Sequence, residues 1–144
     1  MKILVINGPN LNLLGTREPE IYGFDTLEQI NLELVEFAKT LSDSIELEFY
    51  QSNVEGEIIN KIQEAKEFDG LIINPAAYTH TSIAIADAIK GVGIKTVEVH
   101  LSNVTSREDY RKNSFITPTA LGIVAGFGKE SYKMALLGLY KNLC

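Results

Sequence analysis

The feature that most constrains the fold is a regular alternation of short apolar segments with longer amphipathic ones. Strand-like runs are predicted at about 2–7, 45–51, 70–74, 95–101 and 120–126. Between them, apolar residues recur at helical spacing near 26–41, 54–67 and 80–91, and a terminal helix is predicted over about 129–143. Such an alternation predicts a parallel sheet with right-handed crossovers and with helices on both faces.

Five strands in this arrangement predict an α/β fold, a flavodoxin-like three-layer sandwich around a five-stranded parallel sheet of order 2-1-3-4-5. No repeat, low-complexity tract or linker interrupts the 144 residues, so one domain over 1–144 is expected. Two helix starts have the spacing of a capping box, Asp25 with Glu28 and Thr105 with Glu108.

Composition and charge argue against several classes of protein. The net charge of −6 provides no basic face for nucleic acid. No apolar run approaches the roughly 18–20 residues of a membrane span, and Met1 and Lys2 lead directly into a strand instead of a signal peptide. The single cysteine, Cys144, excludes an internal disulfide and a thiolate metal cluster. A cytoplasmic protein without membrane contact is expected.

The loop after the first strand is unusually long and polar. It runs from Asn7 to Gly23 and contains three Asn, three Gly, two Pro, an Arg and a Tyr. A turn between strand and helix usually takes about 2–6 residues. Because α/β proteins carry their ligand-binding and catalytic residues in the loops at the carboxyl ends of the strands, this loop is expected to hold a ligand.

Both histidines of the chain fall at the same predicted edge of the sheet. His80 lies in the segment 74–82 after the third strand, and His100 lies in the segment 98–103 after the fourth. The three arginines also lie in polar, loop-like segments, where a guanidinium is suited to fixed contacts with carboxylates and hydroxyl groups. They are Arg17, Arg107 and Arg111.

The common ligands of this architecture fit poorly. The two histidines and Glu98 allow a metal triad in principle, but the spacing of further acidic residues does not support one. Ser82 and Ser102 lack the elbow motif of serine hydrolases. The first loop has neither a dinucleotide-binding glycine motif nor a Walker lysine, and Asn7 and Asn74 stand where a receiver domain needs acids.

Proton transfer fits the first loop better. Tyrosine is a poor base at neutral pH, because only about one molecule in a thousand is ionised. Tyr22 follows Arg17 by five residues, and a guanidinium within roughly 4–6 Å favours the phenolate. The spacing alone also allows Tyr22 to be a packing residue and Arg17 a solvated loop residue.

Taken together, these segments resemble the type II 3-dehydroquinate dehydratase family, in the right order and over essentially the whole chain. The matching segments are 7–15, 17–19 with 22–23, 55–57, 74–82, 98–103, 107–108 with 111, and 121–128. The resemblance implies conversion of 3-dehydroquinate to 3-dehydroshikimate plus water in the shikimate pathway, without metal or cofactor. It implies an anti elimination from a β-hydroxy ketone through an enolate.

The resemblance also implies the catalytic roles. Tyr22 is the base, and Arg17 favours its ionised form and stabilises the transition state. His100 delivers a proton to the leaving hydroxyl. Asn12 holds a water on the developing enolate oxygen, and Glu98 orients His100 or a neighbouring water.

Substrate-binding positions follow in the same way. Asn74 and the backbone amides of Leu101 and Ser102 are expected to hold the substrate carboxylate, and His80 and Arg111 to contact the ring hydroxyls. The family forms dodecamers, each a tetramer of trimers, in which the position of Asp87 reaches a neighbouring subunit's site.

Three details complete the expectation. Residues 16–25 are predicted to form an active-site lid. Many family members have His after the position of Arg111, whereas this chain has Lys112 and Asn113. Arg107 is assigned to helix capping or a contact between subunits.

Two other classes of function remain open at this point. The first is a flavodoxin-like binding or regulatory domain without catalysis, which a yellow colour or nucleotide binding would indicate. The second is a dehydratase that forms a Schiff base with a lysine. Of the ten lysines, only Lys112 lies near a strand-end motif, so no covalent adduct is expected.

Overall fold

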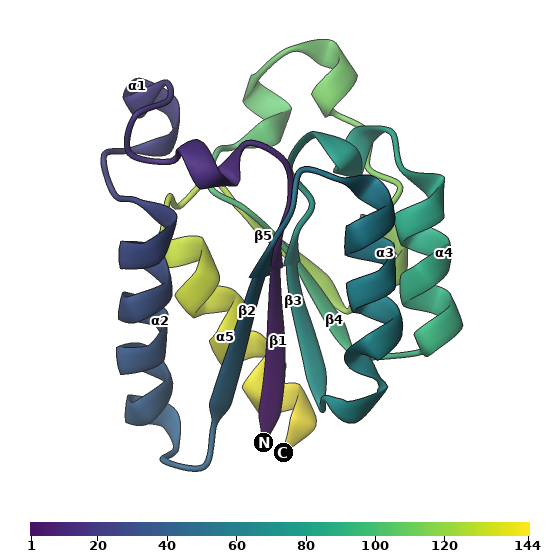
Figure 1. Cartoon of the computed structure of the whole chain (residues 1–144). Helices are drawn as coiled ribbons and strands as arrows, with labels where there is room; N and C mark the ends of the chain where they lie inside the picture. Colours follow the sequence, from purple (N-terminus) through teal and green to yellow (C-terminus); the bar gives the residue numbers. More distant parts are fainter.

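Five parallel strands form one sheet of order β2-β1-β3-β4-β5 in the computed structural model, which describes residues Met1–Cys144 (Figure 1). The strands are β1 (Lys2–Asn7), β2 (Glu46–Gln51), β3 (Gly70–Asn74), β4 (Thr96–His100) and β5 (Gly122–Ala125). The helices are α1 (Pro19–Tyr22), α2 (Leu27–Leu41), α3 (Glu55–Glu64), α4 (Ile83–Val92) and α5 (Glu130–Leu143). The predicted α/β class and strand order are confirmed.

The two faces of the sheet are buried by different helix pairs. Helices α2 and α5 cover one face, and α3 and α4 cover the other (Figure 1). Alternate residues of β1 show why, because Ile3 and Val5 belong to one apolar cluster while Leu4 and Ile6 belong to the other. The central strands are therefore apolar on both sides, which is the continuous apolar pattern seen in the sequence.

The long α2 begins one residue later than the capping-box prediction placed it. Thr26 has extended backbone and is the N-cap, and its Oγ1 accepts a hydrogen bond of 3.2 Å from the amide of Gln29. The Gln29 Oε1 accepts in return from the Thr26 amide at 2.8 Å. Both Asp25–Glu28 and Thr26–Gln29 have the spacing of a capping box, so the sequence does not distinguish them. The backbone angles make Thr26 the N-cap, and the prediction of Asp25 is therefore wrong.

The second predicted capping box, at Thr105 and Glu108, is also wrong. This region forms two separate 3₁₀ turns, Val104–Ser106 and Asp109–Arg111, and no α-helix. The Thr105 hydroxyl donates to Asn103 Oδ1 at 2.8 Å, so it stabilises the turn after β4 instead of a helix start.

The loops after β1 and β3 approach each other closely. The Gly8 amide donates to the carbonyl of Asn74 at 2.8 Å. A Cβ on Gly8 would lie 2.5 Å from the carbonyl oxygen of Pro75, so only glycine fits. These loops lie at one end of the sheet, whereas both chain termini lie at the other (Figure 1). No helix has both the length and the apolar character needed to cross a bilayer.

Gly8→Ala is expected to lower the free energy of unfolding by about 1–3 kcal/mol, because backbone atoms must move to admit the methyl group. Gly56→Ala is the matched control, since a Cβ at this helical position meets nothing within 4 Å. Urea denaturation of both variants measures the difference. Equal stability of Gly8→Ala and wild type would contradict the close approach.

Candidate active site

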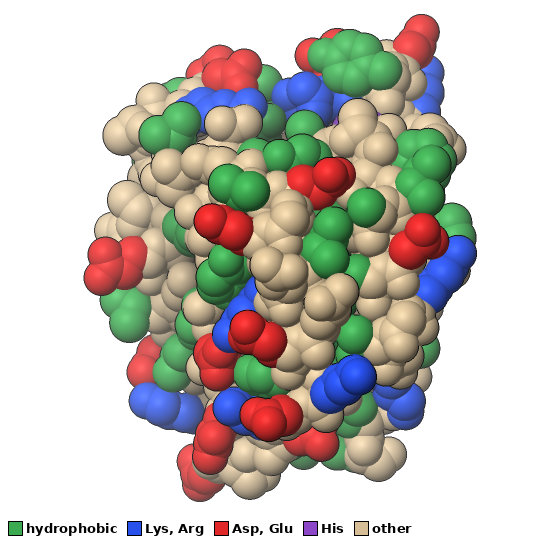
Figure 2. Space-filling view, turned by 45° about the vertical axis from the view of Figure 1, so that its right-hand side comes forward, with side chains coloured by type: hydrophobic (Ala, Val, Ile, Leu, Met, Phe, Trp, Pro, Cys, Tyr) green, Lys and Arg blue, Asp and Glu red, His purple; other side chains and the backbone are tan.

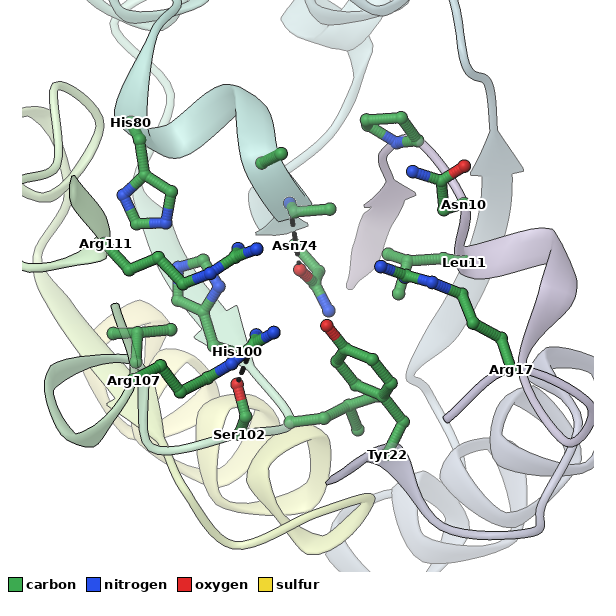
Figure 3. A pocket seen from close by; sticks show the side chains of 15 residues that line it. Asn10, Leu11, Arg17, Tyr22, Asn74, His80, His100, Ser102, Arg107 and Arg111 are labelled. Atoms are coloured by element: carbon green, nitrogen blue, oxygen red, sulfur yellow. Dashed lines mark hydrogen bonds between the residues drawn. The ribbon is translucent and has the colours of Figure 1, made fainter. Parts of the chain in front are cut away.

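A cavity of about 60 Å³ lies at the carboxyl ends of the central strands (Figure 3). The loop after β1, the helix α1, the 3₁₀ turn Ala76–His80 and the loop after β4 all contribute to its wall. Its polar or aromatic lining side chains are Asn10, Arg17, Tyr22, Asn74, His80, His100, Ser102, Arg107 and Arg111. The topology therefore brings most of the predicted site residues together.

All three arginines of the chain line this cavity. Their concentration gives a protein of net charge −6 a local positive site for an anion. Elsewhere the charges are mixed: Figure 2 shows acidic and basic side chains interspersed over the face that carries α3 and α4, with Lys and Arg side chains at the rim above.

The Tyr22 hydroxyl points into the cavity, and guanidinium groups lie against its ring (Figure 3). The Arg17 guanidinium carbon lies 4.9 Å from the ring centroid and that of Arg107 lies 5.4 Å from it. A cation–π contact of this kind fixes the ring and places positive charge against it. The alternative that Arg17 is merely a solvated loop residue is not what the structure shows.

The arginines of the loop after β4 are held by one carboxylate. Glu108 accepts from Arg111 Nε at 2.7 Å, and its Oε2 lies 3.8 Å from Arg107 Nε. Arg107 also donates to the Ser102 hydroxyl at 3.4 Å. Arg107 was assigned to capping or a subunit contact, but its guanidinium lies in the cavity wall.

The carboxylate of Glu98 is fully buried beneath the cavity and contacts His100. Its Oε1 lies 2.7 Å from His100 Nε2, and no surface of the residue is exposed. Hydroxyl groups supply its other hydrogen bonds: Thr79 and Thr117 donate to it, and Ser114 donates at 3.1 Å. One buried charge thus ties β4 to the turn after β3 and to the loop before β5.

These contacts determine the charge state of Glu98. Burial by itself would raise the pKa of this carboxyl, but the hydrogen bonds from His100, Thr117 and Thr79 outweigh it and hold the pKa below its usual range. An ionised carboxylate only accepts hydrogen bonds, so His100 Nε2 carries a proton. The Nδ1 atom of His100 is then the nitrogen left for the cavity.

The second histidine is fixed by a backbone group. His80 Nδ1 lies 2.7 Å from the carbonyl oxygen of Asn113. Because a carbonyl only accepts, Nδ1 is the donor and Nε2 remains for a ligand. The neighbouring Lys112 is exposed and pairs with Asp109 at 2.8 Å, so the departure from the family pattern lies outside the cavity.

Two backbone amides add to the anion-binding character. Leu101 and Ser102 follow β4 and line the cavity, and neither N–H donates to another group of the chain. Adjacent unpaired N–H groups at the end of a strand favour a carboxylate or another oxyanion.

Backbone strain is concentrated in the same region. The three non-glycine residues with positive φ are Asn10 at 69°, Glu18 at 39° and Ala76 at 52°. Asn10 and Ala76 line the cavity, and Glu18 precedes α1. Such conformations cost about 1–3 kcal/mol each and persist where the surrounding structure enforces them.

Besides Glu98, which lies beneath the cavity, two predicted residues lie outside its lining. Asn12 is exposed on the 3₁₀ turn Leu11–Leu13, while Asn10 presents its side chain to the cavity instead. Sequence reasoning missed Asn10 because both asparagines stand in one polar loop and only the turn geometry distinguishes them. Asp87 is exposed on α4 and lines a surface hollow with Ile59 and Gln63 of α3.

The hydroxyl groups around Glu98 were also missed. Thr79, Ser114 and Thr117 come from two loops, and no periodicity marks them as partners of a buried acid. For the metal alternative, no group of three or more His, Cys, Asp or Glu side chains is arranged to hold an ion.

Comparison with protein families supplies the identification. The family model described as "Dehydroquinase class II" matches residues 1–140. The chain belongs to this family. The resemblance seen in the sequence is thereby confirmed.

Individual relatives agree with this family. A 3-dehydroquinate dehydratase of Prochlorococcus marinus (strain MIT 9301) is 59% identical over 140 residues, covering 96% of this chain and 94% of the relative. One of Geotalea daltonii is 54% identical over 144 residues, covering 99% of both. The crystal structure of a type II dehydroquinase from Butyrivibrio crossotus superimposes with a TM-score of 0.93 at 51% identity, covering 97% of each chain.

The buried Glu98 predicts a pH dependence of stability. Its pKa in the fold lies below that of the unfolded chain, about 4.3, so ionised Glu98 stabilises the fold above that pH. This contribution is lost as the pH falls through the lowered pKa. Glu98→Gln is therefore expected to cost about 1.5–3 kcal/mol at pH 7, and the difference from wild type is expected to shrink below about pH 4.

Urea denaturation at several pH values measures this difference. Glu36→Gln is the control, because Glu36 is exposed and pairs only with Lys39, so its effect is expected within about 0.5 kcal/mol. A difference for Glu98→Gln that stays constant down to pH 3 would contradict the assignment.

Proposed function

We propose that this chain is a hydro-lyase that converts 3-dehydroquinate to 3-dehydroshikimate and water, a step of the shikimate pathway toward aromatic amino acids. One observation carries the proposal: a tyrosine with two guanidinium groups against its ring faces the same small cavity as a histidine backed by a buried carboxylate. The chain's membership of the dehydroquinase family agrees with it.

The first step is abstraction of the proton α to the substrate carbonyl by Tyr22. Arg17 and Arg107 lie against its ring and hold it toward the cavity. The electron pair of the broken C–H bond moves to the carbonyl oxygen and gives an enolate. Asn10, which lines the cavity, takes the role first given to Asn12 and binds the enolate oxygen through its amide or a held water.

The second step is loss of the β-hydroxyl as water. Nδ1 of His100 first takes up a proton, which gives the imidazolium, and then donates it to the leaving oxygen while the enolate collapses to the conjugated enone. Glu98 accepts from Nε2 and stabilises the imidazolium that donates this proton. Tyr22 then holds the proton taken from carbon and His100 lacks the one given to the hydroxyl, so each exchanges a proton with solvent before the next cycle, and no change of oxidation state is involved.

The substrate carboxylate is bound by donors at the strand ends. The free amides of Leu101 and Ser102 and the side chain of Asn74 provide neutral donors there. His80, through Nε2, and Arg111 bind the ring hydroxyls. Hydrogen bonds within the chain already fix His80 and Arg111, so binding of the substrate costs little further conformational entropy of these side chains.

Residues 16–25 act as a lid over this site. The cavity of about 60 Å³ is far smaller than the roughly 300–1,000 Å³ of most small-molecule sites, so Arg17 and Tyr22 must move for substrate to enter. Gly23 ends α1 with φ of 85°, and a Cβ there meets nothing within 4 Å. It provides backbone freedom at the edge of the moving segment.

The expected assembly is a cytoplasmic homododecamer built from four trimers, in which Asp87 reaches a neighbouring site. Its support is the family resemblance together with the exposed position of Asp87 on α4, away from the cavity of its own chain.

Light scattering on a sizing column tests the assembly. Twelve chains of 15.9 kDa give a mass of about 190 kDa. Disruption of the assembly by Asp87→Arg is expected to lower both mass and activity, whereas Glu36→Arg on α2 is expected to leave both unchanged. A fully active 16 kDa monomer would contradict the shared site.

The activity itself is tested by mixing protein with 3-dehydroquinate and following the ultraviolet absorbance of the enone. Wild type is expected to turn over in the presence of a metal chelator. Tyr22→Phe and Arg17→Ala are expected to lose about 100-fold or more in kcat, since a general base typically contributes about 10²–10⁴. Tyr50→Phe on β2 is the control, and Tyr22→Phe with wild-type kcat would exclude the proposed base.

The Schiff-base alternative has a separate test. No lysine lines the cavity, so borohydride treatment in the presence of substrate is expected to leave the mass of the protein unchanged. A covalent adduct would replace the Tyr22 mechanism with an amine-dependent one.

A further inference from the structure

A tyrosine hydroxyl lies buried beneath the cavity without a role in the reaction. Tyr132 on α5 is 1% exposed and belongs to the apolar cluster between α2, α5 and the sheet. A buried hydroxyl is costly unless it forms hydrogen bonds, and phenylalanine fills almost the same volume without that cost. The hydroxyl therefore calls for an explanation beyond packing.

The hydroxyl bridges two asparagines at the ends of neighbouring strands. Asn7 and Asn74 are paired in the register of β1 and β3, and both are buried. Tyr132 Oη donates to Asn7 Oδ1 at 2.5 Å and accepts from Asn74 Nδ2 at 2.9 Å. Through this hydroxyl, α5 contacts Asn74, a residue that lines the cavity.

The direction of these hydrogen bonds is fixed from one end. The backbone N–H of Ala76 only donates, and it contacts Asn74 Oδ1 at 3.1 Å. Asn74 must then turn Nδ2 toward Tyr132, whose single proton is left for Asn7. Burial raises the pKa of the Tyr132 hydroxyl well above its ordinary value, so this proton is retained at physiological pH.

These hydrogen bonds determine which atoms of Asn74 are available to a ligand in the cavity. With Oδ1 turned to Ala76 and one Nδ2 hydrogen turned to Tyr132, Asn74 has its second Nδ2 hydrogen left for a ligand. The side chain is held as a donor and not as an acceptor. A donor suits a substrate carboxylate, whereas an amide rotated by 180° would present a repelling oxygen.

We propose that Tyr132 is a positioning residue that completes the restraint begun by the Ala76 N–H: it accepts one Nδ2 hydrogen of Asn74 and so holds the carboxamide with its second hydrogen toward the substrate carboxylate. This inference rests on the proposed function, in which Asn74 binds that carboxylate. The carboxylate is bound alike in the ground state and the transition state, so its contacts affect KM more than kcat. Tyr132 acts only through Asn74 and touches no reacting atom.

Steady-state kinetics of Tyr132→Phe with 3-dehydroquinate test the proposal. KM is expected to rise about tenfold with kcat changed by less than about threefold, since one charge-assisted hydrogen bond is misdirected. Tyr140→Phe, on the same helix but partly exposed, is the control and is expected to keep both constants. An unchanged KM for Tyr132→Phe overturns the proposal.

A double-mutant cycle separates positioning from a general structural effect. Asn74→Ala is expected to raise KM, and adding Tyr132→Phe to it is expected to change KM by less than about twofold. Full additivity of the two changes overturns the proposal, because a packing role for Tyr132 persists without Asn74.

Two further controls keep the outcome clear. If Tyr132→Phe does not fold, Asn7→Ala replaces it, because without the Asn7 acceptor the Tyr132 hydroxyl is no longer held in the position in which it accepts from Asn74 Nδ2. A higher KM is expected, and an unchanged KM contradicts the proposal. If wild type fails to turn over 3-dehydroquinate, the proposed function fails. If wild type is active and both variants keep its KM, only the role of Tyr132 fails.

Discussion

The buried carboxylate of Glu98 is the constraint on which the site depends. It has no exposed surface, and it accepts hydrogen bonds from β4, from the turn after β3 and from the loop before β5. Loss of these donors would leave a buried charge unpaired, which is among the most costly changes a fold can suffer. The same contacts fix Nε2 of His100 as a donor, so one ionised group both joins the loops and orients the histidine that faces the cavity.

The arginines solve a different electrostatic problem. A chain of net charge −6 repels an anionic substrate at long range, and its three guanidinium groups are all placed where that substrate must sit. Two of them also lie against the Tyr22 ring, so in the proposed reaction the guanidinium groups that attract the substrate also hold the tyrosine in place. Glu108 restrains Arg107 and Arg111, whereas Arg17 pairs with Glu18 at 3.5 Å within the segment 16–25.

The sequence predicts the fold well because apolar periodicity reports directly on which faces of strands and helices are buried. It also predicts which loops meet, since the carboxyl ends of parallel strands share one edge. It does not separate Asn10 from Asn12 or Thr26 from Asp25, because those choices depend on backbone angles that neighbours in one polar loop do not reveal. The partners of Glu98 and the Asn7–Tyr132–Asn74 bridge are contacts distant in sequence, and no local pattern encodes them.

In the proposed reaction, Tyr22 forms the enolate and His100 completes the elimination. Proton NMR of 3-dehydroquinate in D₂O tests these roles directly. His100→Ala is expected to exchange the α proton for deuterium while forming almost no 3-dehydroshikimate, and Tyr22→Phe is expected to do neither. Loss of exchange in His100→Ala, or its persistence in Tyr22→Phe, would contradict the assignment of the two roles.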